Sequence, residues 1–502
     1  MKTKRAAINS MVSVATQAIT LLLNMVTRTV FLTYLTVELL GVSTLISSSV
    51  ALVGVADLGV NTAIMFALYR PLATGDRAQI AAIVAYSRKI FAFIALAVGA
   101  MGLLAIPLLP MVGKAGVGTR DLVLYYLIVM AGSVISYLMA DRQVLLLADQ
   151  RLDIIKWANF VSSIVKFLLQ LAVIIAFQNF LAFLIVQSAS VIFGNILAYL
   201  YANSHYSYTK GKHLPLSKEN RKSIATSVRA MLIYRTGGLL LNNTDPIIIS
   251  ALVGTITLGY YSNYMLIVGS ALMFTELIFA SLTAGVGHVV SEGNSERSMK
   301  LFKEIALIAV VIYSTIATVL LVITQDFLTA WLGSTFTLSE PVLWLIVSNF
   351  LLYGLLSPVM VYRTATGLFR DTRYLLLITA FINVALSLLL GHYFGIAGIL
   401  IATLIARLST NFWVEPWLLF RNYLHGRLVD IFLTQALGVA IVGASYAVVI
   451  AIPIEDHLPP IPSILMNAGL AGLLCLGFIW LLWHRTPTGR SLKSRVLNLA
   501  RR

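Results

Sequence analysis

The chain consists of long apolar runs separated by short polar segments. Each run has about 20 residues or more, the length that an α-helix needs to cross the hydrocarbon core of a bilayer. The runs predict fourteen transmembrane helices, at residues 7–34, 40–68, 83–110, 121–147, 153–177, 180–202, 223–252, 257–286, 301–325, 339–365, 372–394, 396–420, 431–452 and 462–483. The predicted fold class is an all-α polytopic membrane protein of 14 transmembrane helices, forming two pseudo-symmetric six-helix bundles plus two C-terminal helices.

Composition narrows the class of protein. Hydrophobic types make up 59% of the 502 residues and charged types 11%, with a mean hydropathy of +0.90. A soluble domain carries about 25% charged residues, so the composition excludes an ordinary cytosolic enzyme, a disordered chain and a collagen-like fibre. The single cysteine excludes an intramolecular disulfide. The histidines are scattered along the chain, and the sequence contains neither a phosphate-binding loop nor a hydrolase motif. We therefore expect no metal site, no catalytic residue and no cofactor.

The basic residues predict the orientation in the membrane. Of the 36 Lys and Arg residues, 30 fall in loops or span ends on the side of the N-terminus, and only Lys114 and Arg120 fall on the other side. Because basic loops stay inside, both termini are predicted to be cytoplasmic. The basic residues behind the net charge of +16 therefore lie near anionic lipid head groups. For this reason we expect no nucleic-acid partner.

The longest cytoplasmic loop divides the predicted helices into groups of six, six and two. The predicted domains are 1–202, an N-terminal six-helix bundle; 203–222, a cytoplasmic linker; 223–420, a C-terminal six-helix bundle; 421–483, two extra transmembrane helices; and 484–502, a basic cytoplasmic tail.

The sequence around Gly41 resembles the sequence around Gly259. Each glycine ends a Leu-Gly pair between two spans, and a carboxylate follows it at similar distance, Asp57 in one copy and Glu276 in the other. Six helices separate the copies, which predicts a parallel repeat about an axis along the membrane normal. Such repeats are common in secondary transporters, with the substrate site at their interface. The alternative is chance similarity between apolar helices.

The first, second, seventh and eighth spans each carry a row of polar or small residues at helical spacing. The rows are Ser10, Ser13, Gln17, Thr20, Asn24 and Arg28; Ser43, Ser47, Gly54, Asp57 and Asn61; Arg235, Gly238, Asn242 and Asp245; and Ser262, Gly269, Glu276 and Thr283. Helix packing explains the small and hydroxyl residues. A charge at the bilayer centre costs at least about 2.5–3.5 kcal/mol, so the charged members favour a hydrated central cavity over buried structural pairing.

Other intramembrane charges have alternative interpretations. Arg28 either pairs with Asp245, at similar depth on the repeat-related helix, or extends outward to the membrane surface. Lys166 lies in mid-span and is predicted to line the first bundle. Arg407 and Glu415 are eight residues apart, about two turns, and are predicted to pair with each other.

Three segments resemble a known family. VADLGVNTAIMFALYRPLATGD, RTGGLLLNNTDPIIISALVGTITLGYYSNYMLI and WLGSTFTLSEP are similar to motifs of bacterial polysaccharide flippases, members of the multidrug/oligosaccharidyl-lipid/polysaccharide exporter superfamily. The resemblance implies a flippase that translocates undecaprenyl-diphosphate-linked oligosaccharide repeat units from the inner to the outer leaflet by alternating access. It implies capsule, exopolysaccharide or O-antigen assembly at the bacterial cytoplasmic membrane, with a polysaccharide polymerase as a candidate partner. The fold needs no partner subunit, so we expect a monomer.

The resemblance also implies roles for the polar residues. The substrate-binding candidates are Arg28, Arg235 and Lys166 for the phosphates, and Asn24, Asn61, Asn242, Tyr261 and Asn263 for the sugars, with contacts to neighbouring helices as the alternative for these five. The carboxylates of Asp57, Asp245 and Glu276 either bind a coupling proton or sodium ion or balance the arginine charges.

Two other functions are alternatives. A cation-coupled multidrug antiporter of the same fold would favour an acidic cavity, whereas basic and acidic candidates are roughly matched here. A membrane-embedded polysaccharide polymerase or ligase needs a sizeable external loop, and the longest predicted external loops, 326–339 and 111–120, are short. We therefore expect a transporter and not an enzyme.

Overall fold

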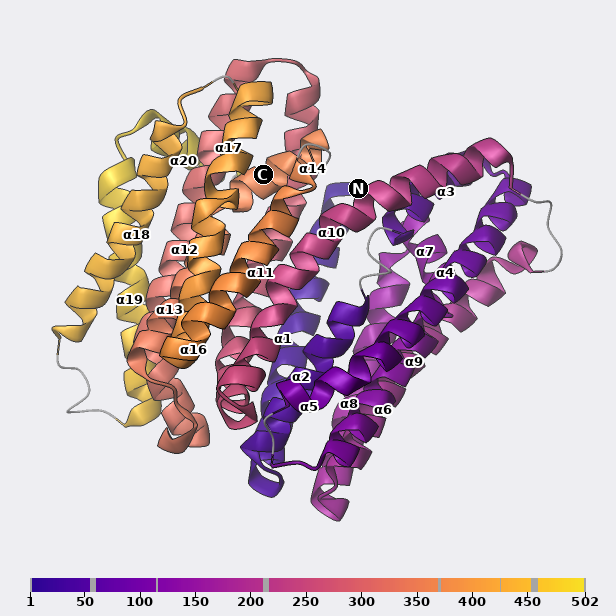
Figure 1. Cartoon of the computed structure of the whole chain (residues 1–502). Coiled ribbons are helices and arrows are strands. Elements are labelled where there is room, and N and C mark those ends of the chain that lie inside the picture. The colour runs from indigo at the N-terminus through magenta and orange to yellow at the C-terminus, as the bar shows by residue number, and fades with distance from the viewer. Residues whose placement is uncertain are drawn as a thin grey trace. The chain divides into compact units, whose positions relative to one another are not determined.

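The computed structural model describes residues 2–54, 60–113, 116–210, 216–368, 372–424, 426–452 and 459–500. Over these ranges the chain is helical, without strands (Figure 1). Eleven helical segments in this part of the chain are long and apolar enough to cross a membrane. The predicted class, an all-α multi-pass membrane protein, is confirmed.

The eleven segments differ from the fourteen predicted spans in three places. Helix α2 (Val37–Val53) has only 17 residues, and α10 (Lys218–Leu252), which carries one of the polar rows, is not among the eleven. The predicted spans 372–394 and 396–420 fall in one apolar segment, but the chain folds back at Gly395, where φ is 57°, so that Asn383 donates a 2.8 Å hydrogen bond to Thr403. The number fourteen therefore stays a prediction.

Contacts divide the chain into two compact units, Met1–Gly259 (unit 1) and Tyr260–Arg502 (unit 2). Unit 1 contains α1 (Lys2–Tyr34), α2, α3 (Val60–Thr74), α4 (Arg77–Ala105), η2 (Ile106–Leu108), α5 (Leu109–Val112), α6 (Thr119–Tyr137), α7 (Ala140–Ala148), α8 (Leu152–Phe177), α9 (Phe180–His205), η3 (Ser207–Thr209) and α10. Helix α10 packs against α2 and α3 and so groups with them. The predicted domain boundaries follow the repeat instead, and they stay a prediction.

Unit 2 is built around α12 (Ser295–Leu332), which packs against α13 (Glu340–Leu355), α18 (Val429–Ile450) and α19 (Pro460–Trp483). The other elements of the unit are α14 (Ser357–Thr366), α16 (Leu375–Ser409), α17 (Asn411–Leu419), the π-helix η5 (Phe420–Leu424), η4 (Ser334–Phe336) and α20 (Pro487–Ala500). Helix α11 (Thr255–Ser291) begins in unit 1 and continues into unit 2.

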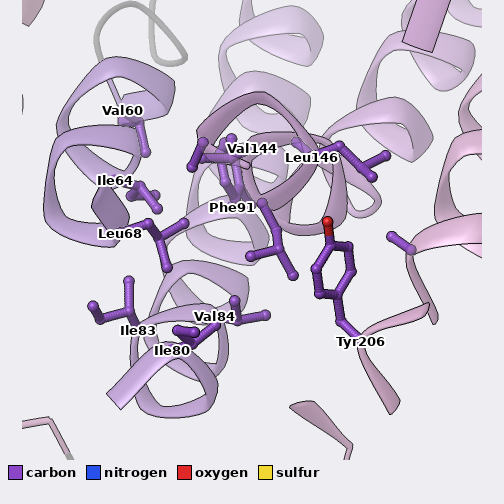
Figure 2. Close-up of a cluster of buried hydrophobic side chains, with 14 of the residues drawn as sticks. Val60, Ile64, Leu68, Ile80, Ile83, Val84, Phe91, Val144, Leu146 and Tyr206 are labelled. Atoms are coloured by element: carbon purple, nitrogen blue, oxygen red, sulfur yellow. The ribbon is translucent and has the colours of Figure 1, made fainter. Parts of the chain in front are cut away.

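Unit 1 has two hydrophobic clusters. Figure 2 shows the first, where Val60, Ile64 and Leu68 form one face of α3 against α4 and α7. Their four-residue spacing is the spacing of a buried helix face. The second cluster surrounds Phe31, whose ring is 5.0 Å from that of Phe183 in an edge-on contact.

The internal repeat is visible in the local geometry of both units. Gly75 and Gly293, 218 residues apart, both adopt left-handed backbone conformations, with φ of 72° and 71°. The next residue caps a helix in each case: the side chains of Asp76 and Asn294 each accept a 2.9 Å hydrogen bond from the backbone amide three residues later. The same turn therefore starts α4 and α12, as a duplicated bundle requires.

The two repeat-related glycines of the sequence pack at one helix crossing within unit 1. A Cβ atom at Gly41 would lie 1.8 Å from the carbonyl oxygen of Thr255, and one at Gly259 would lie 2.2 Å from the carbonyl oxygen of Val37. Val37 precedes Gly41 by four residues and Thr255 precedes Gly259 by four residues, so the two contacts are equivalent in the two helices. Only glycine allows the first turns of α2 and α11 to touch through their backbones.

We expect Gly41→Ala to destabilise the protein by about 1–3 kcal/mol, because the added methyl group overlaps a backbone oxygen. The check is thermal unfolding of purified protein in detergent. Gly238→Ala in α10 is the control, because nothing lies within 4 Å of the added atom. An unchanged unfolding temperature for Gly41→Ala would refute the close crossing.

Candidate functional site

The predicted site residues are distributed over both units. Helix α1 carries Asn24 and Arg28, α3 carries Asn61, α8 carries Lys166, α10 carries Asn242 and Asp245, and α11 carries Tyr261, Asn263 and Glu276. Asp57 and the side chain of Arg235 lie outside the described residues. The substrate-binding and coupling roles of the whole set stay predictions.

Burial separates these residues into three groups. Asp245, Tyr261 and Asn263 are buried, with 8%, 7% and 0% of their surfaces exposed. Arg28, Lys166, Asn24 and Asn61 are half-buried, whereas Asn242 and Glu276 are exposed. The predicted pairing of Arg28 with Asp245 stays a prediction.

Two of the predicted cations lie on neighbouring helices of unit 1. Helix α8, which carries Lys166, packs against α1, which carries Arg28. No ion-pair partner of Lys166 is present among the described residues. A half-buried ammonium group without a carboxylate partner favours a place for water or an anion beside it.

Unit 1 also contains a cavity of about 360 Å³ between α2, α6 and α10. Its lining residues are Ser47, Val50, Ala51, Gly54, Val129, Ser133, Tyr137 and Leu239. Ser47 and Gly54 belong to the polar row of the second predicted span. That part of the row therefore faces an open space, not a tightly packed helix.

The sequence did not identify the α6 side of this cavity. Ser133 and Tyr137 are one turn apart on α6, and the Tyr137 hydroxyl is 3.5 Å from the carbonyl oxygen of Gly54. The only signal was this four-residue spacing in an otherwise apolar helix, which many packed transmembrane helices share.

Glu276 belongs to a polar cluster of unit 2. The Tyr353 hydroxyl donates a 2.8 Å hydrogen bond to Oε1 of Glu276, and the guanidinium group of Arg407 lies 5.5 Å from the centre of the Tyr353 ring. The cluster joins α11, α13 and α16. It places a carboxylate at the hydroxyl of one tyrosine and a guanidinium group over the ring of the same tyrosine.

The predicted pairing of Arg407 with Glu415 is wrong. Glu415 instead accepts a 2.6 Å charged hydrogen bond from Nη1 of Arg363, and its side chain is 2% exposed. The helix changes course between the two residues, because Thr410 has φ −128° and ψ −86°. A separation of eight residues therefore does not place the side chains of Arg407 and Glu415 on one helix face.

A second arginine with a carboxylate partner, Arg142, lies on α7 of unit 1, 3.6 Å from Asp141. Like Arg363, it lies in a segment that the sequence places at the cytoplasmic ends of the spans, yet it is only 1% exposed. Its guanidinium group donates to Thr209 and lies 5.8 Å from the ring centre of Tyr199, at the end of α9. Each unit thus ties two helix ends together through a buried arginine.

Among the described residues, no group of three or more His, Cys, Asp and Glu side chains could hold a metal ion. Nothing in the described geometry combines a nucleophile with a base near the cavity of unit 1. Its arrangement suits binding more than bond-making chemistry.

No protein-family model matches the chain. No curated protein matches it either.

Solved structures with the same fold are membrane transporters. An inward-facing multidrug-resistance transporter of the MATE family, in the MOP superfamily, has a TM-score of 0.63 at 13% identity and covers 85% of this chain and 95% of its own. The lipid II flippase MurJ, in an inward closed conformation, has a TM-score of 0.64 at 15% identity, over 94% of this chain and 99% of its own. The MATE transporter VcmN of Vibrio cholerae gives 0.60 at 15% identity, over 86% and 99%. The chain has the fold of MOP-superfamily transporters.

We expect Arg363→Ala to destabilise the protein by about 3–5 kcal/mol, because the buried Glu415 carboxylate would lose its counter-charge. The double variant Arg363→Met, Glu415→Leu should recover most of that loss. Arg297→Ala, which removes an exposed partner of Glu292, is the control and should cost less than about 1 kcal/mol. Thermal unfolding measures all three, and equal losses for Arg363→Ala and Arg297→Ala would contradict the buried pair.

Proposed function

We propose that this chain is a transporter that flips undecaprenyl-diphosphate-linked oligosaccharide repeat units from the inner to the outer leaflet by alternating access. Its place is the bacterial cytoplasmic membrane, with both termini in the cytoplasm. It supplies the outer surface with units for capsule, exopolysaccharide or O-antigen assembly, where a polysaccharide polymerase uses them. It carries out no covalent chemistry itself.

The observation that carries this proposal is the length of the match to a lipid flippase. MurJ covers 94% of the chain, whereas the first multidrug transporter covers 85%. The difference, 9% of 502 residues, is roughly 45 residues, the length of two helices such as α18 and α19, which have 22 and 24 residues. Both helices pack on α12, so they are integral to unit 2. A fold extended in this way suits a substrate with a long lipid chain.

The intramembrane cations support an anionic head group. A diphosphate cannot enter hydrocarbon without a large desolvation cost, so a flippase must offer compensating charge. Arg28 and Lys166, on packed neighbouring helices, offer it in unit 1, and Arg235 on α10 is the third candidate. Guanidinium groups suit this task because they can bind two phosphate oxygens at once.

Carboxylates are the candidates for energy coupling. Glu276 is exposed and held by Tyr353, and Asp245 is buried on α10. With Asp57, they would exchange a proton or sodium ion as the substrate crosses. The chain needs no other cofactor in this proposal.

Multidrug export is the second candidate function. The multidrug transporters among the neighbours match the fold about as well, with TM-scores of 0.63 and 0.60. The exposed carboxylate of Glu276 is the feature that favours an organic cation. The two functions differ in their cargo, and so in the phenotype of the cell.

We expect Arg28→Ala and Lys166→Ala each to reduce surface polysaccharide at least tenfold in a strain that depends on this gene. Losing a hydrogen bond to a charged group costs about 1.5–3 kcal/mol, which corresponds to a factor of ten or more. Surface glycan is measured by immunoblot, with membrane protein level alongside. Lys300→Ala, at an exposed position of α12, is the matched control and should be normal. Normal glycan in both test variants would contradict the proposal.

We expect expression of the wild-type chain to leave the resistance of a drug-sensitive host to ethidium unchanged. The measurement is the minimum inhibitory concentration with and without the gene. A rise that disappears in Glu276→Gln, with no glycan defect on deletion of the gene, would establish the multidrug function instead.

A further inference from the structure

The described lining of the unit 1 cavity contains no charged side chain. Three hydroxyl groups reach it, from Ser47 on α2 and from Ser133 and Tyr137 on α6, and its other described lining residues are apolar or glycine. A diphosphate would lose its hydration there without a cation in the described lining to replace it. An organic cation would likewise find no described carboxylate in the walls. The hydroxyl groups and apolar side chains of the described lining suit a neutral polar group.

Two of these hydroxyls are available for a ligand. Many serines and threonines in the spans bond to a carbonyl one turn earlier in their own helix, as Thr44 and Ser136 do at 3.0 and 2.8 Å. Ser47 and Ser133 have no hydrogen-bond partner among the described residues. Ser47 is exposed and Ser133 is half-buried, so both hydroxyls can bond to water or to a ligand in the cavity.

Size and wall chemistry together define the occupant. About 360 Å³ is at the lower end of the roughly 300–1,000 Å³ range of small-molecule sites. Val50, Val129 and Leu239 offer an apolar surface, while the serines and the tyrosine offer donors and acceptors. A pyranose ring has this combination: C–H faces for apolar contact and a rim of hydroxyls.

We infer that this cavity binds an uncharged sugar ring of the lipid-linked saccharide, and that Ser47 and Ser133 contact its hydroxyls. The inference rests on the proposed function, which it makes more specific by assigning the sugar to this hydroxyl-bearing cavity. Helix α10 carries Arg235 one turn before Leu239, so a phosphate-binding candidate belongs to the same stretch of helix as the cavity wall.

Protection of a cysteine from alkylation tests the inference. Cys475 is the only cysteine and is buried, so the wild-type chain measures the background. Full-length Ser47→Cys in nanodiscs is treated with N-ethylmaleimide in the presence of one of three probes. These are undecaprenyl diphosphate carrying N-acetylglucosamine, undecaprenyl diphosphate alone, and ethidium.

At a concentration about four times its dissociation constant, the sugar-bearing lipid should slow alkylation about fivefold, because only protein with an empty cavity reacts. The sugarless lipid and ethidium should leave the rate unchanged. Equal slowing by both lipids would overturn the inference, since the sugar would not be the occupant. Slowing by ethidium would overturn it too, and would also favour multidrug export.

A pair of bulky variants separates this inference from the proposed function. Ser133→Leu fills the cavity, whereas Ser136→Leu, on the same helix, changes a residue that does not line it. Ser133→Leu should reduce surface polysaccharide at least fivefold relative to Ser136→Leu at equal protein level in the membrane. Equal glycan in the two variants would overturn the sugar site while leaving the flippase intact. A different result would contradict the proposed function itself: normal surface glycan after deletion of the gene.

Discussion

The cost of placing charge inside a membrane governs this structure. Where a carboxylate is buried, the fold supplies partners: Arg363 for Glu415, and Ser491 and Arg495 for Glu304, at 2.6 and 3.0 Å. Lys166 has no such partner among the described residues. A charge that the protein does not neutralise calls for water or a counter-charge from outside, and an anionic head group provides one.

Duplication explains how the fold organises itself around this constraint. Gly75 and Gly293 start equivalent turns. Gly41 and Gly259 lie at one helix crossing, each against a backbone carbonyl of the other helix. The copies then diverged in chemistry. Arg142 of unit 1 contacts Asp141, the residue before it, and the ring of Tyr199, whereas Arg363 of unit 2 binds Glu415 on another helix.

Apolar length and periodicity were sufficient to predict the fold class, because that class follows from burying helices in lipid. The pairing of charges was not predictable in the same way. Arg407 and Glu415 share a face only on a continuous helix, and the backbone at Thr410 ends that regularity. Ser133 and Tyr137 were missed because only the packing of α6 beside α2 turns an ordinary spacing into a cavity wall.

The central claim is that the chain carries a sugar-bearing lipid diphosphate across the bilayer. The most direct measurement reconstitutes the purified protein in vesicles with undecaprenyl diphosphate carrying a labelled saccharide, and follows the arrival of label on the opposite leaflet with an added lectin. The account predicts transfer much faster than in protein-free vesicles. Transfer at the protein-free rate, from protein that exports ethidium from the same vesicles, would contradict it.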